Sequence, residues 1–250
     1  MFWFKRKEII VDCFIDNSTI EQNFPIEPAH KFFPEGWKTI PKTMPIKVHE
    51  KQYPESNLSV DMATIKKCVG LINLFSNGFI IPAWCDLGVE MDAKGNHLWH
   101  APMNMHVMQH PSFQLWDGLY KDYGHVKLGS PWVIHEKTGV NFTWNQCDWN
   151  NTDDLHKYRI VSGVLDFKYQ HQSNVNMFLR KSSLIDFKAG DPLVHLIPIS
   201  ESNVKIKTHV VDTNELMKLN TNQVQYVNQY RTTKSKIDAK ERKCPFGFGK

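Results

Sequence analysis

Residues 158–199 constrain the fold more than any other part of this chain. They contain short runs of β-branched, aromatic and aliphatic residues separated by polar turns. Apolar and polar residues alternate between positions 174 and 180, as in a β-strand with one face in the core. The sequence Ala189-Gly190-Asp191-Pro192 predicts a tight turn, with Gly190 at a positive φ. A compact apolar run bounded by prolines follows, which is typical of a core strand.

These features predict a mainly β protein, built as a single β-sandwich or distorted barrel of jelly-roll, cupin or β-clip type. We expect a strand and a proline-rich arm in residues 1–57, the β core in residues 58–212, and a C-terminal helix with an aromatic tail in residues 213–250. The core residues expected to be buried are Val164, Leu165, Met177, Leu179, Leu193, Leu196 and Ile197.

Composition is that of an ordinary soluble globular protein. Hydrophobic residues make up 41% and charged residues 22% of the chain, and the net charge of +4 is too small to indicate a nucleic-acid partner. The 5 cysteines are scattered and form no CxxC pair, which favours reduced thiols in a cytoplasmic setting. No apolar run has membrane-spanning length and no cleavable signal pattern is present, so neither membrane insertion nor secretion is expected.

A proline-rich stretch at residues 23–54 follows a first strand predicted over residues 9–15. The density of prolines excludes long regular elements, so we expect an extended arm. Phe32, Phe33 and Trp37 lie on this arm. Because aromatic groups need cover, these residues are candidates for contact with another chain, and packing on the chain's own domain is the alternative.

Two further segments have a helical pattern. Residues 62–77 place apolar residues at helical spacing from Ile65 to Phe75, which predicts a short amphipathic helix. Residues 213–243 contain neither glycine nor proline and predict a longer helix that becomes basic towards its end. The tail after this helix carries Phe246 and Phe248 among glycines, and it is a second candidate surface for another protein chain.

Four histidines, His97, His100, His106 and His110, cluster in one segment of the chain. Neutral imidazoles are ligands for zinc and iron, and iron oxygenases combine two histidines with one carboxylate. The cluster therefore gives an alternative function, a cupin-like or oxygenase-like enzyme that uses iron or zinc. The competing interpretation is ordinary packing and surface histidines, since no HxD or HxE tripeptide occurs in the chain.

An ordered set of short motifs runs through the centre of the chain. It consists of FIIP at 79–82 with Asp86, His125-Val126, PWVI at 131–134 with Gly139, SGVLD at 162–166, FKAGDP at 187–192 and Ile197-Pro198. Over residues 60–205 this set resembles an uncharacterised protein family that occurs in bacteria and in contractile-tailed marine phages. The opening FWFKRK and the aromatic arm look more like the phage members, and the resemblance implies no established activity.

The segment GVLDFKY at 163–169, followed by AGDPLV at 189–194, is similar to the third motif of trimeric dUTPases and dCTP deaminases. That likeness implies that Asp166 would activate water and that Tyr169 would pack on the sugar of a nucleotide. The serine-rich phosphate-binding motif and the glycine-rich C-terminal arm of that family are missing from this sequence. The departure favours shared β-clip architecture over shared nucleotide chemistry.

The function expected from these observations is that of a phage accessory or assembly protein that acts by protein–protein binding. The expected partner is another protein chain, either a second copy or a virion or host protein. The expected location is the cytoplasm of the host cell or the virion. The metal-dependent enzyme and the nucleotide-handling β-clip protein are the alternatives.

Overall fold

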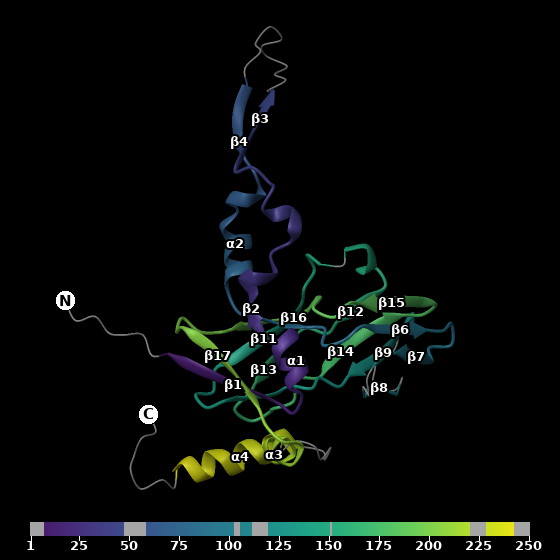
Figure 1. Cartoon of the computed structure of the whole chain (residues 1–250), viewed down its shortest axis with the longest axis vertical. Helices are drawn as coiled ribbons and strands as arrows, with labels where there is room; N and C mark the ends of the chain where they lie inside the picture. Colours follow the sequence, from purple (N-terminus) through teal and green to yellow (C-terminus); the bar gives the residue numbers. More distant parts are fainter. Residues whose placement is uncertain are drawn as a thin grey trace, which may run out of the picture.

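The computed structural model describes residues 8–47, 59–102, 106–111, 120–150, 152–220 and 229–242. Strands account for 41% of the structure and helices for 22%, so the prediction of a mainly β fold is confirmed. The sheets pack in the manner of a sandwich, and the described strands form no closed barrel (Figure 1).

Antiparallel pairing dominates the sheets. The strands are β1 Ile9–Ile15, β2 Glu27–Pro28, β3 Thr43–Lys47, β4 Ser59–Ala63, β5 Phe79–Pro82, β6 Leu87–Met91, β7 His97–His100, β8 Val107–Gln109, β9 Tyr123–Leu128, β10 Val133–Glu136, β11 Asn141–Gln146, β12 Tyr158–Ile160, β13 Gly163–Asp166, β14 Val175–Arg180, β15 Ser183–Phe187, β16 Pro192–Pro198 and β17 Val204–Val210. The two larger sheets have the orders β13-β11-β16-β5-β2 and β12-β14-β9-β8. Smaller sheets, β10-β1-β17 and β15-β6-β7, complete the core, and β3 pairs with β4 in a separate hairpin.

The helices are short. They are α1 Ser18–Asn23, α2 Val69–Ser76, α3 Thr213–Leu219 and α4 Gln229–Arg242, together with the 3-10 turns η1 Ala29–Phe32, η2 Glu35–Trp37, η3 Ile65–Lys67 and η5 Thr152–Asp154. Among the helices described, none is both long enough and apolar enough to cross a membrane. The predicted C-terminal helix is present as two helices, α3 and α4, and residues 221–228 between them lie outside the described part of the chain.

Residues 158–199 form the predicted series of strands, β12 to β16. Met177, Leu179, Leu193 and Leu196 are buried as expected, and Leu165 and Ile197 are half-buried. The prediction for Val164 is wrong, because this side chain is 61% exposed. Neighbouring residues on a strand point to opposite faces, so Val164 and Leu165 could not both face the core from the edge strand β13.

The first strand belongs to the core. β1 lies between β10, with which it pairs antiparallel, and β17, with which it pairs parallel. Its residues alternate strictly between buried and half-buried, and Ile9, Val11, Cys13 and Ile15 point inward. Ile20 and Ile26 also lie in the core and β2 still pairs with β5, so the arm begins after β2.

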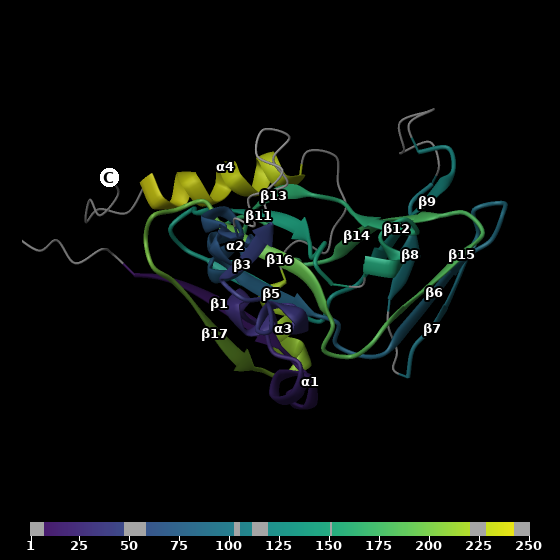
Figure 2. The same ribbon diagram turned by 90° about the horizontal axis from the view of Figure 1, so that it is seen from above.

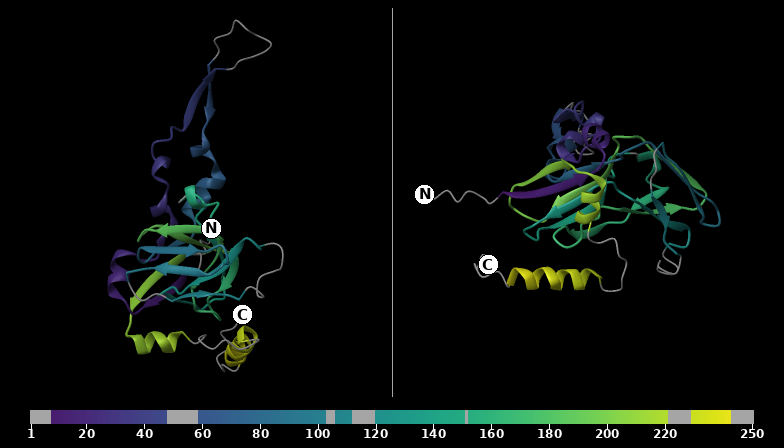
Figure 3. Two further views of the ribbon diagram at one scale, coloured as in Figure 1. Left: turned by 90° about the vertical axis from the view of Figure 1, so that its right-hand side faces the viewer. Right: turned by 60° about the horizontal axis from the view of Figure 1, so that its bottom comes forward.

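An arm projects from the β core. Figures 1 and 3 show β3, β4 and α2 standing away from the sheets at one end of the molecule, while α3 and α4 lie at the other end. Seen from above, in Figure 2, the sheets spread sideways under the base of the arm. The arm thus offers side chains that the core does not cover.

Candidate functional site

Aromatic rings fasten the arm to the core. The Phe75 ring of α2 lies 5.0 Å from the Phe33 ring, 5.2 Å from the Trp37 ring and 5.0 Å from the Trp149 ring, measured between centroids. Trp149 also donates a hydrogen bond from Nε1 to the backbone oxygen of Phe32, at 3.2 Å. Edge-to-face and tilted contacts of this kind add to the free energy that area burial supplies. The base of the arm is therefore a packed joint.

This joint is where the structure places the aromatic residues predicted as an interaction surface. Phe33 and Trp37 stack on one another at 5.7 Å, and Phe32 packs against the small buried cluster around Ile80. All three rings remain half-buried within the chain's own contacts. The other predicted contact residues, Phe246 and Phe248, lie outside the described residues.

The hairpin above the joint has one apolar face. The register pairs Met44 with Met62 and Ile46 with Val60, so these four side chains lie on the same face of the ribbon. Met44 is 51% exposed and Met62 is 50% exposed, and Ile46 and Val60 are exposed as well. We call these four residues the apolar face of the arm. The opposite face carries Asp61, which pairs with Pro45.

The stem of the arm carries three more exposed apolar residues. Ile65, Val69 and Ile72 are all exposed, Val69 to 68%. The helix predicted over residues 62–77 is shorter than expected, since α2 covers Val69–Ser76 and η3 precedes it. Of its predicted apolar side only Phe75 is buried, and the Phe75 ring is part of the aromatic joint. Large exposed apolar patches mark interaction sites.

The four histidines of the metal hypothesis do not converge within the described structure. His97 and His100 lie three residues apart on β7, and His97 Nδ1 is 2.9 Å from Gln109 Oε1. His110 stacks on His125 with ring centroids 4.3 Å apart, and His106 is exposed before β8. In the parts of the chain that are described, no group of three or more His, Cys, Asp and Glu residues could hold a metal ion.

Asp166 and Tyr169, the residues of the nucleotide hypothesis, lie beneath the C-terminal helix. The Tyr169 hydroxyl donates a hydrogen bond of 2.6 Å to Asp238 Oδ1 of α4, and Lys234 Nζ lies 5.2 Å from the centre of the Tyr169 ring. Burial raises the pKa of Asp166, whose Oδ1 accepts a hydrogen bond from the Lys168 backbone N–H. Tyr169 is only 6% exposed, so little of its ring is left for contact with a sugar.

A second contact holds the C-terminal segment against the β core. It involves two histidines that were not predicted from the sequence as functional residues. His135 Nε2 and His171 Nδ1 lie 3.0 Å and 3.1 Å from the backbone oxygen of Leu219, the last residue of α3. The two rings stack at 3.6 Å. Burial, and then the neighbouring His171, lowers the pKa of His135 to about 4. Two neutral imidazoles can therefore satisfy one carbonyl that the helix leaves unpaired.

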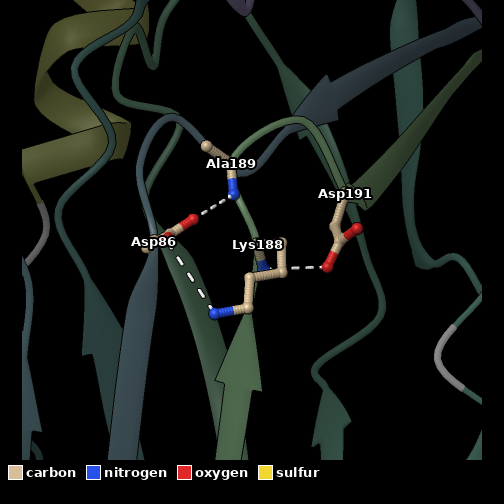
Figure 4. A network of polar contacts seen from close by, with 4 residues as sticks. All are labelled: Asp86, Lys188, Ala189 and Asp191. Carbon is tan, nitrogen blue, oxygen red and sulfur yellow. Dashed lines mark hydrogen bonds and ion pairs between the residues drawn. The ribbon is translucent and has the colours of Figure 1, made fainter.

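The sequence FKAGDP at 187–192 has a structural role in the turn at Asp191. Figure 4 shows Asp86 accepting a hydrogen bond from the Ala189 backbone N–H, at 2.9 Å, and Asp191 Oδ2 accepting one from the Lys188 backbone N–H, also at 2.9 Å. Gly190 has a φ of 92° and donates its N–H to Ala83 O at 2.8 Å. The carboxylates thus fix the loop that joins β15 to β16.

Gly190→Ala should lower the free energy of unfolding by about 1 kcal/mol or more, because an L side chain rarely adopts this φ. A Cβ at this position would be 3.7 Å from the Phe24 ring, an ordinary contact, so the cost comes from the backbone. Chemical denaturation of the variant measures it. The matched control is Gly163→Ala, where a Cβ meets nothing within 4 Å and φ is not positive. Equal midpoints for the two variants would contradict the strained turn.

Comparison with known proteins does not assign this chain to a family. A scan against protein-family models finds no match, and a search of curated proteins finds no similar chain. Function must therefore be inferred from the surfaces described above.

Proposed function

We propose that this protein is an accessory or assembly protein that acts by binding another protein chain through the apolar face of its arm. The observation that carries the proposal is the exposure of Met44, Met62, Ile46 and Val60 on one face of a two-stranded ribbon. An isolated hairpin is marginally stable in water, and a third layer on its apolar face would stabilise it. A partner that covers this face supplies that layer.

The partner to which we commit is a second copy of the chain. The apolar face contains paired aliphatic residues and no charged residue, so two copies can stack it upon itself around a two-fold axis without burying a charge. Ile65, Val69 and Ile72 are further exposed apolar residues of the same arm. A standard interface engages roughly 20–30 residues from each partner, so these seven residues would form only part of the contact surface.

The resemblance of residues 60–205 to a family of bacteria and contractile-tailed phages supports the placement of this binding in phage assembly. On that proposal the protein works in the cytoplasm of the host cell or within the virion. The closed packing around Tyr169 and the separated histidines give the nucleotide and metal alternatives less support than the arm has.

Sedimentation velocity of the full chain tests the proposal. We expect the wild-type chain to dimerise as its concentration rises. The variant Met62→Lys should dimerise about tenfold or more weakly, because association would bury an unpaired charge.

Asp61→Lys is the matched control, since it adds the same lysine on the opposite face of the same strand. It should keep the dissociation constant of the wild type within about twofold. A wild-type chain that stays monomeric at every concentration would refute the choice of a second copy. Equal weakening by the two lysines would refute the apolar face as the contact surface.

A further inference from the structure

A row of amide side chains lines one face of the segment that leads into β14. The residues are Gln170, Gln172, Asn174 and Asn176, and the residues between them, His171, Ser173 and Val175, are buried. This strict alternation directs the amides to one side of an extended backbone.

The amide row forms one wall of a pocket of about 180 Å³, which we call the amide pocket. Its other walls come from distant parts of the chain: Trp144 of β11, residues 161–163, and Lys127 of β9, which lies directly opposite Asn176 in the β9–β14 register. The pocket therefore lies where the two larger sheets meet. Sites assembled from several segments with a few convergent polar groups are typical of ligand binding.

Part of the amide row is already oriented. Asn174 Nδ2 donates a hydrogen bond of 3.0 Å to Gln172 Oε1, and Asn174 Oδ1 accepts one of 3.3 Å from the Ser130 backbone N–H. These contacts fix the amide of Asn174 without using all of its hydrogen-bonding capacity, since each amide has two N–H donors and an oxygen with two lone pairs. The Gln170 end of the row is exposed, whereas the Asn176 side chain at the other end is hydrogen-bonded to His125.

We infer that the amide pocket binds carbohydrate, as a short oligosaccharide whose hydroxyl groups exchange hydrogen bonds with the amide row. An amide donates and accepts at once, and so does a hydroxyl group. Leu165 lines the same pocket and offers apolar contact to the C–H face of a sugar ring, while Trp144, which also lines it, is only 3% exposed and belongs to the core. None of the described lining residues is acidic, and Lys127 is the cation among them. A single cation favours a neutral or singly charged ligand over a polyanion such as a nucleic acid.

A larger hollow of about 520 Å³ beside the β14–β15 turn is a poorer candidate, despite its size. Its lining includes Lys157, which forms an ion pair with Asp154 at 2.5 Å, and Lys181, whose Nζ donates to the backbone oxygen of Lys121 at 2.7 Å. Two of its cations are thus already occupied within the chain.

Titration of the isotope-labelled full chain with three trisaccharides, followed by NMR, tests the inference. The probes are maltotriose, N-acetylated chitotriose and trigalacturonic acid, which separate neutral, amide-bearing and acidic chains. We expect at least one of the two neutral probes to shift the side-chain NH₂ signals of Gln170, Gln172 and Asn174 in a saturable manner. Trigalacturonic acid carries three carboxylates and should bind more weakly than the neutral probes, and tightest binding of this probe would contradict the preference for a neutral or singly charged ligand.

Gln170→Ala and Gln172→Ala should each weaken that binding about tenfold, through loss of hydrogen bonds. Gln170 is exposed, so its variant keeps the test independent of folding. Asn73→Ala, an exposed amide on α2, is the matched control and should bind as the wild type does. Failure of all three probes at millimolar concentration would overturn the inference. An affinity that is the same in the wild type and in the pocket variants would overturn it as well. Saturable binding of a trinucleotide, with no binding of any of the sugars, would also overturn it.

Discussion

Replacing Glu136 with alanine should lower the free energy of unfolding by about 3 kcal/mol or more, the largest loss that we expect from one polar side chain. Glu136 is 2% exposed. Its Oε1 accepts the Thr138 N–H at 2.6 Å and the Thr138 hydroxyl, and its Oε2 accepts the N–H groups of Gly139 and Val140 at 2.6 Å and 3.0 Å. Alanine leaves all these donors without the acceptor that closes the turn between β10 and β11.

The variant Glu136→Gln distinguishes the effect of the carboxylate's charge and second acceptor oxygen from the effect of the side chain's shape. Glutamine has a single acceptor oxygen, so this variant should retain part of the stability that Glu136→Ala loses. Lys137→Ala, at the exposed neighbouring position, should change the free energy of unfolding by less than about 0.5 kcal/mol. Urea denaturation measures all three. A Glu136→Ala loss as small as that of Lys137→Ala would show that the carboxylate does not organise this turn.

Phe75→Ala should cost the arm about 3 kcal/mol of local stability, because it removes the ring that contacts Phe33, Trp37 and Trp149. The loss should be confined to the arm, since Phe75 belongs to α2 and not to the sheets. Hydrogen exchange should therefore accelerate in residues 65–76 and stay unchanged in β14 and β16.

Ile72→Ala is the control for Phe75→Ala, because Ile72 lies on the same helix and is exposed. In a monomeric sample it should leave exchange in α2 nearly unchanged. If Phe75→Ala accelerated exchange throughout the core, the arm would not be a separately fastened unit.

Local patterning predicts the strands of this protein well. Alternation and turn chemistry between residues 158 and 199 predict β12 to β16, the positive φ of Gly190 and the burial of Met177 and Leu179. Val164 shows the limit of that reasoning, because hydrophobicity alone does not reveal which face of an edge strand is covered.

The sequence predicts the arm but not the hairpin of β3 and β4 within it, because the prolines argue against strands. Pro45 argues against regular structure, yet it lies within β3. A strand tolerates proline when it is an edge strand, and both strands of an isolated ribbon are edges. The period of two in the segments TMPIK and SVDMA would have indicated the apolar face. Register, which is a long-range property, decides that Met44 and Met62 meet.

The candidate sites also depend on contacts between distant segments. Clustering in sequence suggested a metal site at His97, His100, His106 and His110, whereas the histidines that share a carbonyl, His135 and His171, are far apart in the chain. The alternation of amides from Gln170 to Asn176 is visible in the sequence. The position of Lys127 opposite Asn176 follows only from the pairing of β9 with β14.

Disulfide cross-linking of the full chain tests whether two copies meet through the apolar face of the arm. The background carries Cys68→Ser and Cys244→Ser, because Cys68 is exposed and Cys244 lies outside the described residues, while Cys13, Cys85 and Cys147 are buried. Met62→Cys or Ile46→Cys places one thiol on the apolar face, and Asp61→Cys places one on the opposite face.

Mild oxidation should convert the Met62→Cys or the Ile46→Cys chain into a covalent dimer of twice 29.1 kDa. The Asp61→Cys chain should remain largely monomeric under the same conditions, since its thiols would point away from the interface. If Asp61→Cys cross-linked as fast as the apolar-face variants, the apolar face would not be the contact surface between two copies. If none of the three variants cross-linked, two copies would not meet through the hairpin.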